Sequence, residues 1–193
     1  MLTDTQLWDL SKRMNFPLEA IVFKDKLAKI EMNKSYIINL QDHEDERGNK
    51  NSGTHWTCFQ INKSPNGKVE GIYFDPYGVG MPKDVEEAIK KSIGKSIPHT
   101  TKDIQSLMNN ACGWFCCAFL HWINCKTYST GELYLDTSNF LDMFDDLEKS
   151  VDFKKNEYML KHFFRSADEK KRMPVSVDMT TIVEKTGECE NNI

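Results

Sequence analysis

Three features that would point to a membrane, secreted or nucleic-acid-binding protein are missing from this sequence. No apolar run approaches the roughly 20 residues that cross a bilayer. The first ten residues lack the basic-then-apolar layout of a signal peptide. The formal net charge is −4, so the chain as a whole has no strong attraction to nucleic acid. We therefore expect a protein without a membrane span that is not secreted.

Internal repeats and low-complexity blocks are also missing, so a repeat architecture is not expected. The 193 residues suffice for one domain with a real core, and 39% hydrophobic residues is ordinary for a globular chain. We assign residues 1–166 to one domain. Residues 167–193 form a charged and then polar C-terminal tail, either flexible or docked on the domain, and we expect a monomer.

Hydrophobic periodicity and turn residues predict an α+β fold. The segment 113–124 is apolar nearly all round, so it should be a central, buried helix in a mixed sheet flanked by helices. Helices are expected at 3–14, 82–92, 113–124, 140–147 and 156–164, and strands at 35–40, 54–61, 69–74 and 103–107.

The segment Ala-Cys-Gly-Trp-Phe-Cys-Cys-Ala-Phe-Leu-His at 111–121 carries the strongest chemical signal. It places Cys112 at the start of the buried helix, where unpaired backbone N–H groups create partial positive charge. That environment favours a thiolate, which is the form of cysteine that attacks carbonyls. Cys112 is therefore a candidate nucleophile.

Three polar residues upstream complete an acyl-transfer site. His55 opens one strand of a predicted hairpin and Asp75 ends the other, so the two side chains should lie together. Asp75 could then orient the imidazole of His55 as general base. Gln105 lies shortly before Cys112, and its amide could donate to an oxyanion together with the Cys112 backbone N–H. Trp56 and Gly113, next to His55 and Cys112, are candidate substrate contacts.

Each signal is weak alone, and a metal site is an alternative reading of the same cysteines. Zinc is commonly bound by cysteine and histidine, which this chain carries at positions 112, 116, 117, 121 and 125. On one helix, at about 100° per residue, they fall on opposite sides and cannot converge tetrahedrally. We therefore expect no metal ligand among them and expect the cysteines to be free thiols.

Four motifs of this chain resemble those of the adenain family, the adenovirus maturation proteases. They are Gly-Thr-His-Trp, Phe-Asp-Pro-Tyr-Gly, Gln-Ser and Ala-Cys-Gly-Trp-Phe-Cys-Cys-Ala-Phe-Leu-His. The clan also holds proteases specific for ubiquitin-like modifiers. The resemblance runs from about residue 35 to 124, with a weak return at 156–166. It implies a papain-like core in permuted order and a cysteine endopeptidase with Cys112, His55, Asp75 and Gln105 in the roles above.

The chain departs from the adenain pattern in two ways. Adenain carries Glu where this chain has Asp75, although other clan members use Asp. Adenain is also activated by DNA and by a peptide that is disulfide-linked to a cysteine between the acid and the glutamine. This chain has no cysteine between Asp75 and Gln105, and its net charge is negative. Neither an activating peptide nor DNA is carried over as a cofactor.

The resemblance further implies cleavage of viral capsid or core precursor proteins at Gly-containing sites, in the virion and in the host cell's cytoplasm or nucleus. Two alternatives stay open: a protease that removes ubiquitin-like modifiers, and a non-catalytic binding module on the same fold. A structural zinc protein is a third alternative.

Overall fold

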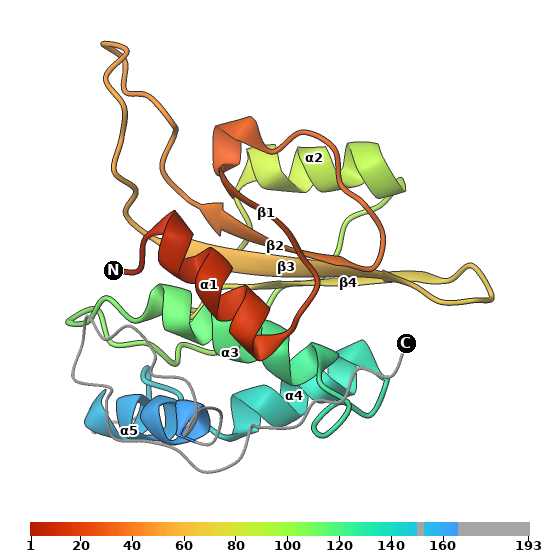
Figure 1. Ribbon diagram of the computed structural model, residues 1–193, viewed down its shortest axis with the longest axis vertical. Helices are drawn as coiled ribbons and strands as arrows, with labels where there is room; N and C mark the ends of the chain where they lie inside the picture. Colours follow the sequence, from red (N-terminus) through yellow and green to blue (C-terminus); the bar gives the residue numbers. More distant parts are fainter. Residues whose placement is uncertain (150–152, 166–193) are drawn as a thin grey trace.

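A four-stranded sheet separates two layers of helices in the computed structural model, which describes residues 1–149 and 153–165 (Figure 1). One face of the sheet carries helix α2. Helices α1, α3, α4 and α5 lie on the other face, with α3 nearest the sheet. The architecture is mixed α+β with helices on both faces, as the sequence predicts. The expected tail at 167–193 lies outside the described residues.

The sheet has the order β1-β2-β3-β4. Strands β1 and β2 are parallel, while β2–β3 and β3–β4 pair antiparallel, so the sheet is mixed. The strands are β1 (Leu18–Phe23), β2 (Lys34–Asn39), β3 (Trp56–Lys63) and β4 (Val69–Phe74). The last three confirm predicted strands.

One strand was missed, and one strand prediction is wrong. Strand β1 was not predicted, because its side chains are half-buried without the alternation that marks a strand in sequence. The predicted strand at 103–107 is wrong. The backbone N–H groups of Ile104 and Gln105 both donate to the carbonyl of Pro76, at 2.9 and 3.1 Å, so this segment is an irregular loop and not part of a ladder.

Four of the five predicted helices are confirmed, with ends that shift by three residues at most. The helices are α1 (Asp4–Met14), α2 (Lys83–Ile93), α3 (Cys112–Asn124), α4 (Leu133–Asp142) and α5 (Phe153–Phe164), with a 3-10 turn, η1 (Lys24–Lys26). Thr3 caps α1 in a capping box with Gln6, because each accepts a backbone N–H of the other.

The helix predicted at 140–147 is wrong in its bounds, because α4 begins seven residues earlier and ends at Asp142. The start of α4 is fixed by Asp136, whose buried carboxylate accepts hydrogen bonds from the Ser129 hydroxyl and from the backbone N–H and hydroxyl of Thr130. These hydrogen bonds are not visible in the hydrophobic pattern of the sequence.

Side chains of β3 alternate between the two faces of the sheet. Trp56 and Cys58 pack on the side of α3, whereas Phe59 and Ile61 pack on the side of α2. Helix α3 is buried almost throughout, between the sheet and the outer helices α1, α4 and α5. This central position fixes the N-terminus of α3 relative to the ends of β3 and β4.

Candidate active site

The β3–β4 hairpin brings a histidine and a carboxylate together. Cys58 pairs with Phe74 in the antiparallel register, so the chain entering β3 and the chain leaving β4 lie side by side. His55 immediately precedes β3 and Asp75 immediately follows β4. The Nε2 atom of His55 lies 2.8 Å from Oδ1 of Asp75, so the juxtaposition predicted from the hairpin is present.

Asp75 is a buried carboxylate, with 1% of its surface exposed. Its Oδ1 atom also accepts the backbone N–H of Tyr77 at 2.8 Å, and its own backbone N–H donates to the Thr100 hydroxyl at 3.3 Å. Its Oδ2 atom is buried with no partner among the described residues. A buried carboxylate needs a positive or donating partner, and here His55 supplies it.

Cys112 lies at the first position of α3 and is buried against this pair. Its side chain lies near enough to His55 to act on the pKa of that imidazole. Burial lowers the pKa of His55, but the hydrogen bond with Asp75 and the nearby Cys112 outweigh it and raise that pKa to about 9. At neutral pH the imidazole is therefore protonated, between an acid on one side and a sulfur on the other.

Gln105 is buried, with 1% of its surface exposed, in the loop that leads to α3. Its Nε2 atom donates to the Tyr77 hydroxyl at 3.2 Å and to the Asn109 carbonyl at 3.2 Å. Its Oε1 atom has no partner among the described residues. Because the backbone N–H of Gln105 donates to Pro76, the loop is tied to the turn that follows Asp75.

Tyr77 joins these parts and was missed by sequence reasoning. Its ring stacks on His55 with centroids 4.5 Å apart, its backbone N–H donates to Asp75, and its hydroxyl accepts from Gln105. The segment Asp-Pro-Tyr-Gly reads as ordinary turn chemistry. The signal that could have pointed to Tyr77 is its place two residues after a candidate catalytic acid, within a tight turn.

Gly78 closes that turn, donating its backbone N–H to the Asp75 carbonyl at 2.9 Å. Its φ is +68°, and a Cβ atom there would lie 2.6 Å from the carbonyl oxygen of Thr101. Only glycine suits both conditions, so the close approach of Tyr77 to His55 depends on this residue.

The two expected substrate contacts are buried against the N-terminal segment. Trp56 donates its indole N–H to the Leu2 carbonyl at 2.9 Å, and a Cβ atom on Gly113 would lie 3.2 Å from Leu7. Trp56 is only 3% exposed. Their assignment as substrate contacts stays a prediction, which this packing does not support.

The other cysteines occupy the core. Cys58, Cys112, Cys116 and Cys117 are free and buried, as expected, whereas Cys125 is disulfide-bonded, so the expectation of free thiols is wrong there. Burial raises the pKa of the Cys116 and Cys117 thiols well above their ordinary value. These two thiols are therefore far less reactive than an exposed one.

His121 packs at the far end of α3 from Cys112. Its Nδ1 atom lies 2.6 Å from the Met14 carbonyl, and burial lowers its pKa, so it is neutral and donates to that carbonyl. Within 1–149 and 153–165 no group of three or more His, Cys, Asp or Glu side chains is placed to hold a metal ion.

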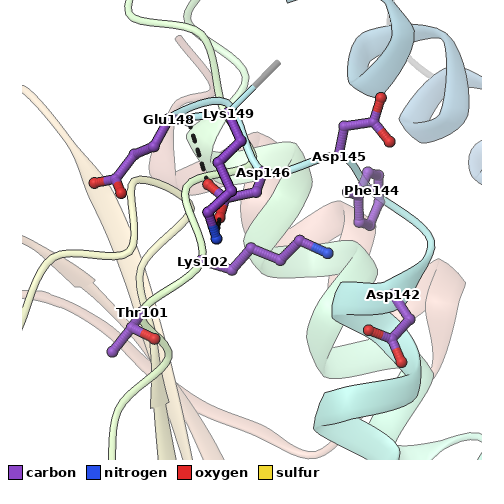
Figure 2. Close-up of a pocket in the computed structure, with 8 residues that line it drawn as sticks. All are labelled: Thr101, Lys102, Asp142, Phe144, Asp145, Asp146, Glu148 and Lys149. Atoms are coloured by element: carbon purple, nitrogen blue, oxygen red, sulfur yellow. Dashed lines mark hydrogen bonds and ion pairs between the residues drawn. The ribbon is translucent and has the colours of Figure 1, made fainter.

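A separate polar hollow lies between residues 101–102 and residues 142–149 (Figure 2). None of the four candidate catalytic residues lines it. Lys149 is paired with Asp146 at 2.9 Å, and Lys102 donates to the Leu141 carbonyl at 2.9 Å. Its two lysines are therefore engaged within the protein.

No protein-family model matches the chain, and no curated protein matches it. Across the described ranges, no helix is both long enough and apolar enough to pass through a membrane.

Proposed function

We propose that this chain is a cysteine endopeptidase with Cys112 as nucleophile. The observation that carries the proposal is the position of His55, which is hydrogen-bonded to a buried carboxylate, Asp75, and lies near the Cys112 side chain at a helix N-terminus. Gln105 lies in the same cluster through Tyr77. Nucleophile, base, orienting acid and amide donor are the parts that acyl transfer needs.

In the proposed reaction the Cys112 thiolate attacks the scissile carbonyl, while the proton stays on His55. The negative charge on the carbonyl oxygen is stabilised by the Cys112 backbone N–H and by the Gln105 amide hydrogen that donates to the Tyr77 hydroxyl in the free protein and exchanges that bond for the oxyanion. His55 then donates its proton to the leaving amine, which leaves an acyl-enzyme. Water deprotonated by His55 then attacks the thioester, which releases the carboxylic acid product and restores the Cys112 thiolate and the His55 imidazolium. Asp75 stabilises the imidazolium throughout.

The order His, Asp, Gln, Cys along the chain favours a papain-like core in permuted order, with the nucleophile helix after the strands that carry base and acid. By its resemblance to the adenain family, the protein is proposed to mature viral capsid or core precursors at Gly-containing sites, in the virion and host cell, as a monomer. The motif around Cys112 favours this over removal of ubiquitin-like modifiers.

The test combines intact-mass analysis with peptide cleavage. Wild type, Cys112→Ala and Cys116→Ala are incubated with limiting iodoacetamide and, separately, with Gly-Gly-containing peptides. Cys116 is the matched control, because it is a buried thiol one turn further along the same helix. We expect fast labelling and cleavage in wild type and Cys116→Ala, and neither in Cys112→Ala.

A binding module would instead be supported if all thiols are labelled slowly and no peptide is cleaved. This result would have to hold both for the protein alone and after addition of DNA and capsid-derived peptides. Cleavage or capture of a ubiquitin-like probe in preference to the peptides would support the modifier-specific alternative.

A further inference from the structure

The loop from Gln105 to Cys112 is held by α5. Asn109 lies in the middle of this loop, and its backbone carbonyl accepts one hydrogen of the Gln105 amide. The Asn109 side chain makes two further bonds. Its Oδ1 atom accepts the backbone N–H of Ala111 at 3.1 Å, and its Nδ2 atom donates to Oε1 of Glu157 on α5 at 2.5 Å.

The neighbouring residue of α5 holds the other end of the loop. The buried Asn156 donates through Nδ2 to the carbonyl of Ile104, at 3.1 Å, directly before Gln105. Two consecutive residues of one helix therefore fix the backbone on both sides of Gln105. The hydrogen bond from Asn156 joins a neutral amide to a backbone carbonyl, whereas the hydrogen bond from Asn109 is accepted by the carboxylate of Glu157.

We propose that Glu157 and Asn109 form a clamp that positions Gln105 as an oxyanion donor, an inference that rests on the proposed function. Oxyanion donors act because they are fixed before charge develops, so the hold on the Asn109 carbonyl matters for the rate. The bond to Glu157 is charge-assisted and therefore the stronger of the two side-chain bonds that Asn109 makes. Asn109 and Glu157 are positioning residues, since neither belongs to the reacting set.

The clamp can be tested by exchanging its donor and acceptor. Asn109→Asp keeps the oxygen that accepts from Ala111 but sets a carboxylate against Glu157. Glu157→Gln keeps an acceptor for Asn109. The double variant Asn109→Asp/Glu157→Gln restores one donor and one acceptor with their places exchanged. Because Glu157 is only half-buried, Glu157→Ala adds a variant with little risk to folding.

Three quantities are measured for each folded variant, with the fold checked by far-UV circular dichroism. They are kcat and KM for a cleaved peptide, the affinity for a peptide aldehyde, and the rate of Cys112 alkylation by iodoacetamide. The aldehyde adds the Cys112 thiol across its C=O bond, and the resulting oxygen occupies the oxyanion site. Alkylation needs the thiolate but no oxyanion donor, so it reports on Cys112 alone.

We expect Asn109→Asp to lower kcat and aldehyde affinity by about tenfold or more, with KM and alkylation rate within about twofold of wild type. Glu157→Ala should lower the same two quantities by a smaller factor. Glu157→Gln should resemble wild type, and the double variant should recover most of the loss.

Equal kcat and aldehyde affinity in wild type, Asn109→Asp and Glu157→Ala would overturn the clamp while leaving the protease intact. Failure of the double variant to recover kcat, with its fold intact, would overturn it as well. A wild type that neither cleaves peptides nor binds the aldehyde would overturn the proposed function, and the clamp with it.

Discussion

The ring of Tyr77 stacks on the imidazole of His55, with centroids 4.5 Å apart and planes inclined by 22°. The same residue donates its backbone N–H to Asp75 and accepts from Gln105 through its hydroxyl. One residue therefore contacts the base, its acid and the amide donor, the acid through its backbone and the other two through its side chain. An aromatic face next to an imidazolium stabilises the charged form by cation–π attraction.

Replacing Tyr77 should separate these contributions. Tyr77→Leu removes the ring and should lower the pKa of His55 by about 0.4–1.5, since cation–π contacts contribute about 0.5–2 kcal/mol. Tyr77→Phe keeps the ring and should leave that pKa near 9. NMR titration of the His55 ring protons measures both. Identical titration of wild type and both variants would show that stacking does not support the charge.

Asp75→Asn tests the acid without changing its shape. The hydrogen bond with Asp75 is the largest influence that raises the pKa of His55, so the neutral amide should let that pKa fall toward 6.5. The alkaline limb of kcat/KM should therefore move to lower pH, and the rate should drop by about 10²-fold or more. A pH–rate profile with an unchanged alkaline limb would contradict this role for Asp75.

Gln105→Leu removes the amide donor while filling most of its buried space. Loss of one oxyanion donor lowers kcat by about 10²–10³-fold in other enzymes, and we expect a drop in that range. The rate of Cys112 alkylation should stay within about twofold, because it needs no oxyanion donor. Steady-state kinetics and timed mass spectrometry measure the two effects. A drop confined to KM would mean that Gln105 binds the substrate and does not stabilise the transition state.

Much of the fold could be predicted because its signals are local. The hairpin turn at 64–67 and the alternation along β3 place β3 and β4, and the apolar stretch around Phe115 places α3. Strand β1 was missed because its two faces are equally half-buried. The start of α4 was missed because it depends on hydrogen bonds from Ser129 and Thr130 to Asp136, which periodicity does not encode.

The candidate site also has a part that local sequence signals predict and a part that they do not. His55 and Asp75 could be placed together from a hairpin, since antiparallel pairing fixes which strand ends meet. The supports of Gln105 could not be predicted. Tyr77 reaches it across a turn, and α5 reaches its loop through Asn156 and Glu157, contacts that depend on how separate elements pack.

The stability of the protein should depend on the charge of His55. Its pKa is about 9 when folded, against an ordinary value of 6.5, so the folded state holds this proton more tightly than the unfolded chain. The resulting stabilisation is fully present below about pH 6.5 and is lost as the pH rises through about 9. Its size is on the order of 3 kcal/mol, because each tenfold change in proton affinity contributes about 1.36 kcal/mol. Urea unfolding at pH 6, 7.5 and 9.5 measures it.

His55→Gln is the control for that measurement, because it removes the titrating group. We expect the free energy of unfolding of wild type to fall between pH 6.5 and 9.5, and that of His55→Gln to fall much less. The difference between the two proteins should therefore be largest at pH 6 and smallest at pH 9.5. A difference that is constant across this range would mean that the His55 proton is bound equally in the folded and unfolded states. The hydrogen bond of His55 with Asp75 and its nearness to Cys112 would then not favour an imidazolium.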